Sequence, residues 1–133
     1  MTLRNNDTLP PTILVVDDQR STRSILRQAL VEHYNAAVLE AVDGETALAM
    51  IEDNYPDVVL CDIQMQPVDG LTLLRAVRAH EDGRITNIPF IVMSAVATRE
   101  IVVAANKSGA TGILAKPISL KMLTARMDSA LKR

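Results

Sequence analysis

Five polar side chains of this 133-residue sequence each follow a short apolar run, and together they have the types needed for phosphoryl chemistry. They are Asp17, Asp18, Asp62, Ser94 and Lys116. Three crowded carboxylates repel one another unless a cation lies among them, and oxygen ligands of this kind suit Mg²⁺. A lysine can hold a phosphoryl oxygen, a hydroxyl can donate to another, and a carboxylate can itself accept a phosphoryl group. These types therefore predict a Mg²⁺ site at which an aspartyl phosphate forms.

These side chains can meet only if separate strands end at one edge of a sheet. The apolar runs that precede them, together with one further run, predict strands at 12–16, 37–42, 57–61, 88–94 and 111–115. Continuous apolar runs, rather than alternating ones, are typical of parallel strands that are covered on both faces. Open parallel sheets bind ligands beyond the carboxyl ends of their strands. We therefore expect the polar strand ends to form one site.

Segments with helical spacing of apolar residues separate the strands. They lie around 25–30, 47–51, 71–78, 101–105 and 120–131, and the polar stretch 80–88 is predicted to be a loop. Asp43 and Ser119 are the predicted N-caps of the second and last helices. Five strands alternating with five helices predict a doubly wound α/β domain with helices on both faces of the sheet.

Other polar residues near the predicted site have simpler interpretations. Arg20, Arg23 and Arg27 are expected along a solvated face of the first helix. Asp69 is expected to be a turn residue before Gly70 and not a metal ligand.

Composition limits the remaining possibilities. The length fits one domain, and a net charge of -2 gives no general attraction to nucleic acid or to an anionic membrane. Aromatic residues make up only 2% of the chain, which argues against base-stacking surfaces. The single cysteine, Cys61, is interpreted as a buried strand residue. Residues 1–11 are expected to be a flexible N-terminal leader. The chain has neither a signal peptide nor a membrane span, so a cytoplasmic location is expected.

The polar strand ends and their neighbours resemble the receiver domain of two-component response regulators, in particular the single-domain chemotaxis receiver. The matching segments are Ile13–Asp18, Asp62–Met65, Val68–Gly70, Pro89–Ala95 and Ala115–Pro117. The resemblance implies a flavodoxin-like (βα)5 fold with strand order 2-1-3-4-5, and a receiver domain over residues 12–133.

The resemblance also implies a role for each site residue. Asp62 would be the phospho-acceptor, Ser94 the switch hydroxyl, and Lys116 the phosphoryl-binding residue. The peptide bond before Pro117 would be cis.

The metal would be Mg²⁺. Its ligands would be Asp17, Asp18, Asp62 and the backbone carbonyl of Gln64, with Asp17 acting mainly through water.

The family's partners follow from the same resemblance. The phosphoryl donor would be the histidine of a sensor histidine kinase or of a histidine phosphotransfer protein. The readout face would be about residues 97–131. Because the sequence ends at Arg133, we expect a stand-alone switch, not an enzyme, that assists its own phosphorylation and dephosphorylation. Its output would be a downstream protein target, with no direct contact to nucleic acid or membrane, and the chain would be a monomer or a phosphorylation-dependent dimer.

Two departures from the family pattern leave alternatives open. Ile113 stands where the family often has an aromatic residue, and the proline in the loop 65–68 lies one position later than in the commonest pattern. One alternative is a docking module that works without phosphorylation. The other is a dehalogenase-like phosphatase, which needs an acid where this sequence has Gln64.

Overall fold

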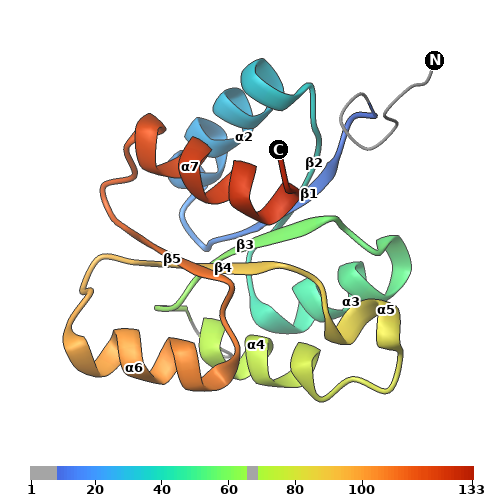
Figure 1. Cartoon of the computed structure of the whole chain (residues 1–133), viewed down its shortest axis with the longest axis vertical. Coiled ribbons are helices and arrows are strands. Elements are labelled where there is room, and N and C mark those ends of the chain that lie inside the picture. The colour runs from blue at the N-terminus through green and yellow to red at the C-terminus, as the bar shows by residue number, and fades with distance from the viewer. Residues whose placement is uncertain (1–8, 66–68) are drawn as a thin grey trace.

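The computed structural model describes residues 9–65 and 69–133, in which short strands alternate with helices (Figure 1). The strands are β1 (Thr12–Val16), β2 (Ala37–Ala41), β3 (Val58–Asp62), β4 (Phe90–Ser94) and β5 (Gly112–Ala115). The helices are α2 (Arg20–Tyr34), α3 (Gly44–Asn54), α4 (Gly70–Arg78), α5 (Gly83–Thr86), α6 (Arg99–Ser108) and α7 (Leu120–Leu131). The predicted strands and helices are all present, with ends that differ by up to five residues.

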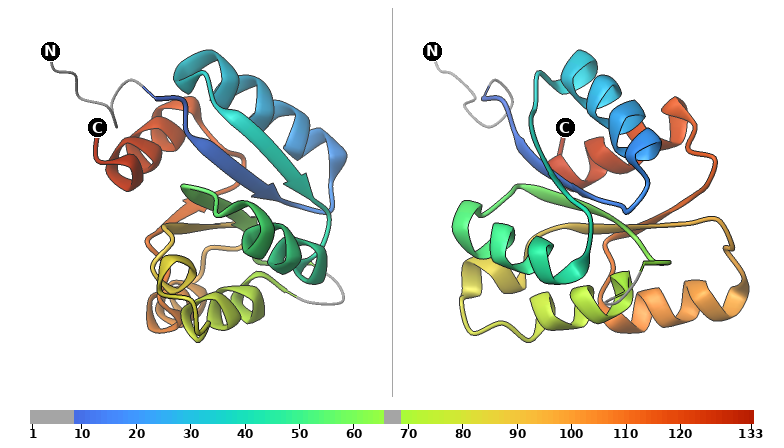
Figure 2. Two further views of the ribbon diagram at one scale, coloured as in Figure 1. Left: turned by 90° about the vertical axis from the view of Figure 1, so that its right-hand side faces the viewer. Right: turned by 180° about the vertical axis from the view of Figure 1, so that it is seen from behind.

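The five strands form one parallel sheet in the order β2-β1-β3-β4-β5, which confirms the expected fold class and order. Helices α2 and α7 cover one face, whereas α3, α4, α5 and α6 cover the other (Figure 2). The chain moves outward from β1 in both directions, so β1 and β3 flank the point where the strand order reverses. That point is where open α/β sheets place their ligands.

Alternate strand residues build two separate apolar cores, as the pleat of a strand requires. In β1, Ile13 and Val15 pack with Leu26 of α2 and Met127 of α7. The intervening β1 residues Leu14 and Val16 join the helices on the other face in the second core. The β1 residues 13–16 are fully buried, so the strand that leads into the acidic pair is fixed from both sides.

Both predicted N-caps are confirmed. The Asp43 carboxylate accepts a hydrogen bond of 2.8 Å from the backbone N–H of Thr46, and the Ser119 hydroxyl accepts one of 3.1 Å from Met122. Asp69, expected to be a turn residue, is likewise the N-cap of α4. These caps fix where the helices begin after their strands.

The stretch expected to be a loop between α4 and β4 contains the one-turn helix α5. The Asp82 carboxylate is its N-cap: it accepts a hydrogen bond of 2.9 Å from the backbone N–H of Arg84, and also one of 2.8 Å from the Tyr55 hydroxyl. Ile85 is buried beneath this turn. Contacts with the end of α3 therefore stabilise a helix too short to have its own periodicity.

The expectation of a solvated arginine face on α2 is wrong for Arg23, whose side chain is only 13% exposed. Glu40 of β2 lies between two arginines of α2, with Arg23 Nε at 2.9 Å and Arg27 Nε at 2.7 Å from its carboxylate oxygens. This three-residue ion pair joins α2 to the outermost strand.

Most of the predicted leader, residues 1–8, lies outside the described residues. Pro11 is buried, and its carbonyl accepts a hydrogen bond of 2.9 Å from the backbone N–H of Ala37. Among the helices of the described part, none is long and apolar enough to cross a membrane.

Candidate functional site

Two neighbouring strands carry carboxylates to the point where the strand order reverses. Asp17 directly follows β1, and Asp62 is the last residue of β3. One carboxylate oxygen from each of Asp17, Asp18 and Asp62 lies within 4.8 Å of the others. Asp17 and Asp62 are buried and Asp18 is exposed, so two carboxylates of the cluster are shielded from water and the third is in contact with it.

Lys116, which follows β5, lies between the two buried carboxylates. Its Nζ is 2.9 Å from Asp17 Oδ2 and 3.2 Å from Asp62 Oδ2, and its side chain is 16% exposed. The Lys116–Pro117 peptide bond is cis, as the resemblance implied. The structure thus brings together the lysine and the carboxylates that the sequence placed at three different strand ends.

The surroundings oppose ionisation of Asp62. Burial and the charge of Asp17 raise the pKa of the Asp62 carboxyl, although Lys116 and the backbone N–H of Gln64 act in the opposite direction. Burial alone would lower the pKa of Lys116, but hydrogen bonds and charges from Asp17 and Asp62 together raise it. One ammonium therefore only partly compensates two buried carboxylates, and a further cation would relieve the remaining repulsion.

Ser94 ends β4 beside this cluster and is fully buried. Its hydroxyl donates to the carbonyl of Val96 at 2.7 Å and accepts from the Val96 N–H at 3.0 Å. The amide of Gln64 lies 3.1 Å from the same hydroxyl oxygen. The hydroxyl thus holds the start of the β4–α6 loop to the end of β4.

Gln64 links the serine to the acidic cluster. Its backbone N–H donates to Asp62 Oδ1 at 3.2 Å, while its side chain reaches Ser94. A glutamine cannot exchange a proton as a general acid does, so the phosphatase alternative lacks its second catalytic group.

The sequence did not indicate a second layer of contacts around Asp17. The Arg23 guanidinium donates to the Asp17 carbonyl at 2.8 Å, and the Gln19 N–H donates to Asp17 Oδ1 at 2.8 Å. The sequence offers one weak indication of these contacts: an arginine in the first turns of the helix that follows the acidic pair.

Ile113, the position where the family often has an aromatic residue, is partly buried in β5 and packs against the core on the α3–α6 face. The atypically placed proline of the loop after β3, Pro67, lies outside the described residues, whereas Met65 at its start is buried.

The donor set fits Mg²⁺ by its chemistry. All the ligand atoms are carboxylate oxygens, and the exposed Asp18 leaves room for the water ligands that Mg²⁺ retains. In the part of the chain that the structure describes, this is the one cluster of acidic or metal-binding side chains with that spacing.

Comparison with known families and proteins agrees with this geometry. A family model described as the response regulator receiver domain matches residues 13–128. The chain is 39% identical over 126 residues to the response regulator MprA of Mycobacterium sp. (strain KMS), covering 94% of this chain but 52% of that protein. It is 33% identical over 121 residues to the chemotaxis protein CheY of Pseudomonas aeruginosa, covering 91% of this chain and 96% of that protein. The chain therefore spans about half the length of MprA and nearly all of CheY.

Solved structures with the same fold include the chemotaxis response regulator CheY4 of Vibrio cholerae. The TM-score is 0.83 at 26% identity, with 92% of this chain and 99% of that chain covered. The receiver domain of the Francisella response regulator 1452 gives a TM-score of 0.81 at 32% identity, with 92% and 98% covered.

Proposed function

Because this chain belongs to the response regulator receiver domain family of two-component signalling, we propose that it is a switch controlled by phosphorylation of Asp62. The observation that carries the proposal is the contact of Lys116 Nζ with both Asp17 and Asp62 inside the acidic cluster. This arrangement offers a nucleophilic carboxylate, a cation for the transferred group and oxygen ligands for a metal at one place.

The proposed transfer uses the residues as follows. A carboxylate oxygen of Asp62 attacks the phosphorus of a phosphohistidine, the N–P bond breaks, and the imidazole nitrogen keeps the electron pair and takes up a proton. An acyl phosphate forms on Asp62, with Lys116 holding one phosphoryl oxygen. Attack by water on the phosphorus later releases inorganic phosphate and restores the carboxylate. The protein thus assists its own phosphorylation and dephosphorylation and acts on no separate substrate.

Mg²⁺ is the proposed cofactor, held by Asp17, Asp18, Asp62 and the backbone carbonyl of Gln64. When bound, it supplies positive charge that neutralises the phosphoryl oxygens during transfer. The repulsion that raises the pKa of Asp62 supports a cation at this place.

Ser94 is the proposed switch hydroxyl. Its bonds to Val96 hold the loop before α6. A phosphoryl group on Asp62 carries about two negative charges and strong acceptor oxygens, which would compete with the Val96 carbonyl for the hydroxyl. Movement of Ser94 toward that group would release the loop and bias the position of α6.

The proposed output is contact between residues 97–131 and a downstream protein. Supporting this, the segment leaves apolar side chains exposed on two helices: Val103 (40%) on α6, and Leu120 (50%) and Met122 (41%) on α7. Leu120 and Met122 both lie in the first turn of α7, and exposed apolar side chains that gather in one place are typical of interaction sites.

The proposed phosphoryl donor is a sensor histidine kinase or a histidine phosphotransfer protein. Ile25 of α2 is 66% exposed beside a hollow of about 190 Å³, which Lys116 also lines. The other lining residues are Thr22, Leu26, Pro117 and Ile118. An apolar surface at the edge of the acidic cluster is suited to dock a donor helix whose histidine must reach Asp62.

The test is incubation with acetyl phosphate and Mg²⁺, followed by intact-mass measurement. We expect one phosphoryl adduct on the wild type and on Asp53→Asn, a control that removes an exposed carboxylate of α3, and none on Asp62→Asn. Absence of an adduct on the wild type, both with acetyl phosphate and with a phosphorylated histidine kinase, would overturn the proposal in favour of phosphorylation-independent docking. Catalytic turnover of a small phosphate ester would instead favour the phosphatase alternative.

A further inference from the structure

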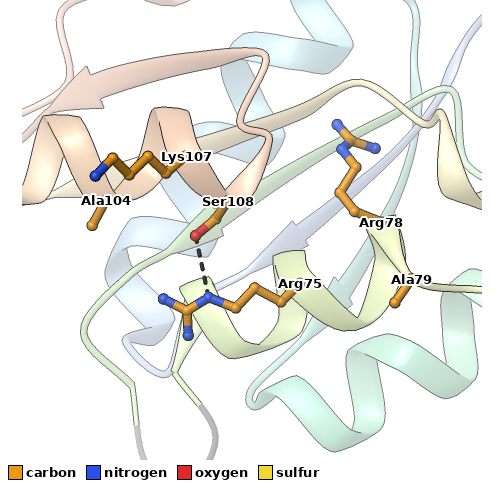
Figure 3. Close-up of a pocket in the computed structure, with 6 residues that line it drawn as sticks. All are labelled: Arg75, Arg78, Ala79, Ala104, Lys107 and Ser108. Carbon is orange, nitrogen blue, oxygen red and sulfur yellow. Dashed lines mark hydrogen bonds between the residues drawn. The ribbon is translucent and has the colours of Figure 1, made fainter.

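A basic groove lies between α4 and α6 (Figure 3). It has a volume of about 520 Å³. Its lining residues are Arg75, Arg78, Ala79, Ala104, Lys107 and Ser108. Arg78 bonds to the chain just before β4 and just before β5, so the groove lies at the amino ends of these strands. The acidic cluster lies beyond the carboxyl ends of the strands, so the groove is a separate surface.

The groove is positively charged, although the chain as a whole carries a net negative charge. Three of its six lining residues are cationic and none is acidic, whereas the whole chain has a net charge of -2. Among the described residues, neither Lys107 Nζ nor the two terminal nitrogens of Arg75 have a hydrogen-bond or ion-pair partner. These groups are available to a ligand.

Arg75 is oriented for such a ligand. Its Nε donates to the Ser108 hydroxyl at 3.2 Å, which positions the guanidinium across the groove between the two helices (Figure 3). The two terminal nitrogens remain, and these form the fork that binds a carboxylate through two parallel hydrogen bonds.

Hydrogen bonds hold the side chain of Arg78 in place in the wall of the groove. It donates to the carbonyls of Gly109 at 3.0 Å, and of Thr86 and Ile88 at 2.8 Å each. All of these partners are neutral, so the positive charge of Arg78 stays uncompensated by them. Gly109 permits the contact, because a Cβ there would lie 3.0 Å from the Arg78 side chain.

The groove continues along α6. A second hollow, of about 450 Å³, shares Ala104 and Lys107 with the first and extends past Val103 to Arg99 and Glu100. Neither hollow has an aromatic lining residue on which a nucleotide base could stack. A long, mainly basic channel with one exposed apolar position fits an extended peptide better than a nucleic acid.

From these observations we infer that the α4–α6 groove binds an acidic segment of a protein partner, with Arg75 and Lys107 contacting its carboxylates. Binding does not depend on phosphorylation of Asp62, so failure of the phosphorylation test leaves this inference standing.

The probe is a fluorescently labelled synthetic peptide of alternating glutamate and serine, with the glutamine analogue as its control. Fluorescence anisotropy measures affinity, and amide NMR shifts of the unphosphorylated protein locate the site. The double variant Arg75→Gln/Lys107→Gln removes the two proposed contacts. The matched double variant Arg20→Gln/Lys132→Gln removes one exposed arginine and one exposed lysine that lie outside both the groove and residues 97–131.

We expect the glutamate peptide to shift amides of 75–79 and 104–108. The Arg75→Gln/Lys107→Gln variant should weaken its binding by about fivefold or more, and the matched variant by less than about twofold. The inference is overturned if the glutamine peptide binds equally well, if both double variants weaken binding alike, or if no binding occurs. Tighter binding of a short DNA duplex to the same residues would also overturn it, in favour of a nucleic-acid surface.

Discussion

Asp62 carries a charge that its own surroundings disfavour. Burial and the charge of Asp17 raise its pKa in the folded protein, and Lys116 only partly offsets this. The folded state therefore holds a proton on Asp62 more tightly than the unfolded state does. Above the raised pKa the ionised group costs stability, and below the unfolded pKa both states are protonated and the cost disappears.

We accordingly expect Asp62→Asn to raise the free energy of unfolding at pH 7 in metal-free buffer. The gain should shrink as the pH falls toward about 4, near the unfolded pKa of an aspartate. Urea unfolding at several pH values measures this, with Asp53→Asn as the control that should change little. A variant less stable than the wild type at pH 7 would show that the Lys116 contact outweighs the cost of burial.

At the residue scale, the sequence was enough to find the candidate site but not its supporting contacts. Asp17, Asp62 and Lys116 were identifiable because each polar residue directly follows an apolar strand, and parallel strands end at one edge. The bond from Arg23 to the Asp17 carbonyl was not identifiable. Arg20 and Arg23 lie three residues apart on the same helix, and only the packing of α2 against β2 decides which of them is covered.

The ion pair of Arg23 and Arg27 with Glu40 is the main polar link between α2 and the edge of the sheet. The hydrogen bond from Arg27 is the largest cause that lowers the pKa of Glu40. A lowered folded pKa means that the ionised glutamate stabilises the folded state above the unfolded pKa. This contribution is lost as the pH falls through the folded pKa.

Replacement of Glu40 by glutamine should therefore cost about 1 kcal/mol of unfolding free energy at pH 7, because two partly covered arginines lose their counterion. The difference from the wild type should vanish well below about pH 4.3, the usual pKa of a glutamate. Denaturant unfolding at both pH values tests this, with the exposed Glu81→Gln as control. A difference that does not depend on pH would mean that packing, and not charge, is responsible.

Gly70 is the point where the loop from Asp62 turns into α4. A Cβ there would clash with the backbone carbonyl of Asp62 and lie 3.0 Å from the Cα of Ile63. The Gly70 N–H also donates to the Ile63 carbonyl at 3.0 Å. The start of α4 is therefore packed directly on the backbone that carries Asp62.

For this reason Gly70→Ala should destabilise the protein by about 1–3 kcal/mol and slow phosphorylation by acetyl phosphate. Gly83→Ala is the matched control, because a Cβ at Gly83 meets nothing within 4 Å. That variant should stay within about 0.5 kcal/mol of the wild type, or gain slightly. Equal unfolding free energies for the two variants would contradict the close packing of α4 on β3.

At the element scale, the sequence predicted every strand but missed details that depend on pairing. Asp62 was left out of its apolar run because it is polar, yet it pairs with Met93 as the last residue of β3. Helix α5 was missed because one turn has no apolar periodicity, and its stability comes from Tyr55 and other distant contacts.

Three carboxylates of the molecule gather beyond the carboxyl ends of its strands, although the net charge of the chain is only -2. If the cluster of Asp17, Asp18 and Asp62 binds Mg²⁺ in the folded state alone, the metal must stabilise the fold. A concentration ten times the dissociation constant should add about 1.4 kcal/mol, and a domain of this size should then melt several degrees higher.

Thermal unfolding with Mg²⁺, compared with an ionic-strength-matched sodium salt, measures this effect. Asp18→Asn should reduce the increase in Tm because it removes an exposed ligand, whereas Asp53→Asn should not. A Tm that responds equally to both salts would indicate general charge screening without a metal site.

Cys61 is fully buried in β3 next to Asp62, and burial raises the pKa of its thiol well above the usual value. It is the single cysteine of the chain. A thiol reagent can therefore reach it only when the central strand opens. The alkylation rate of Cys61 therefore measures how often β3 opens, one residue from the proposed phospho-acceptor. Comparing the alkylation rates with and without Mg²⁺ or acetyl phosphate would report how strongly metal binding or phosphorylation at Asp62 suppresses the opening of β3. The measurement needs no added label.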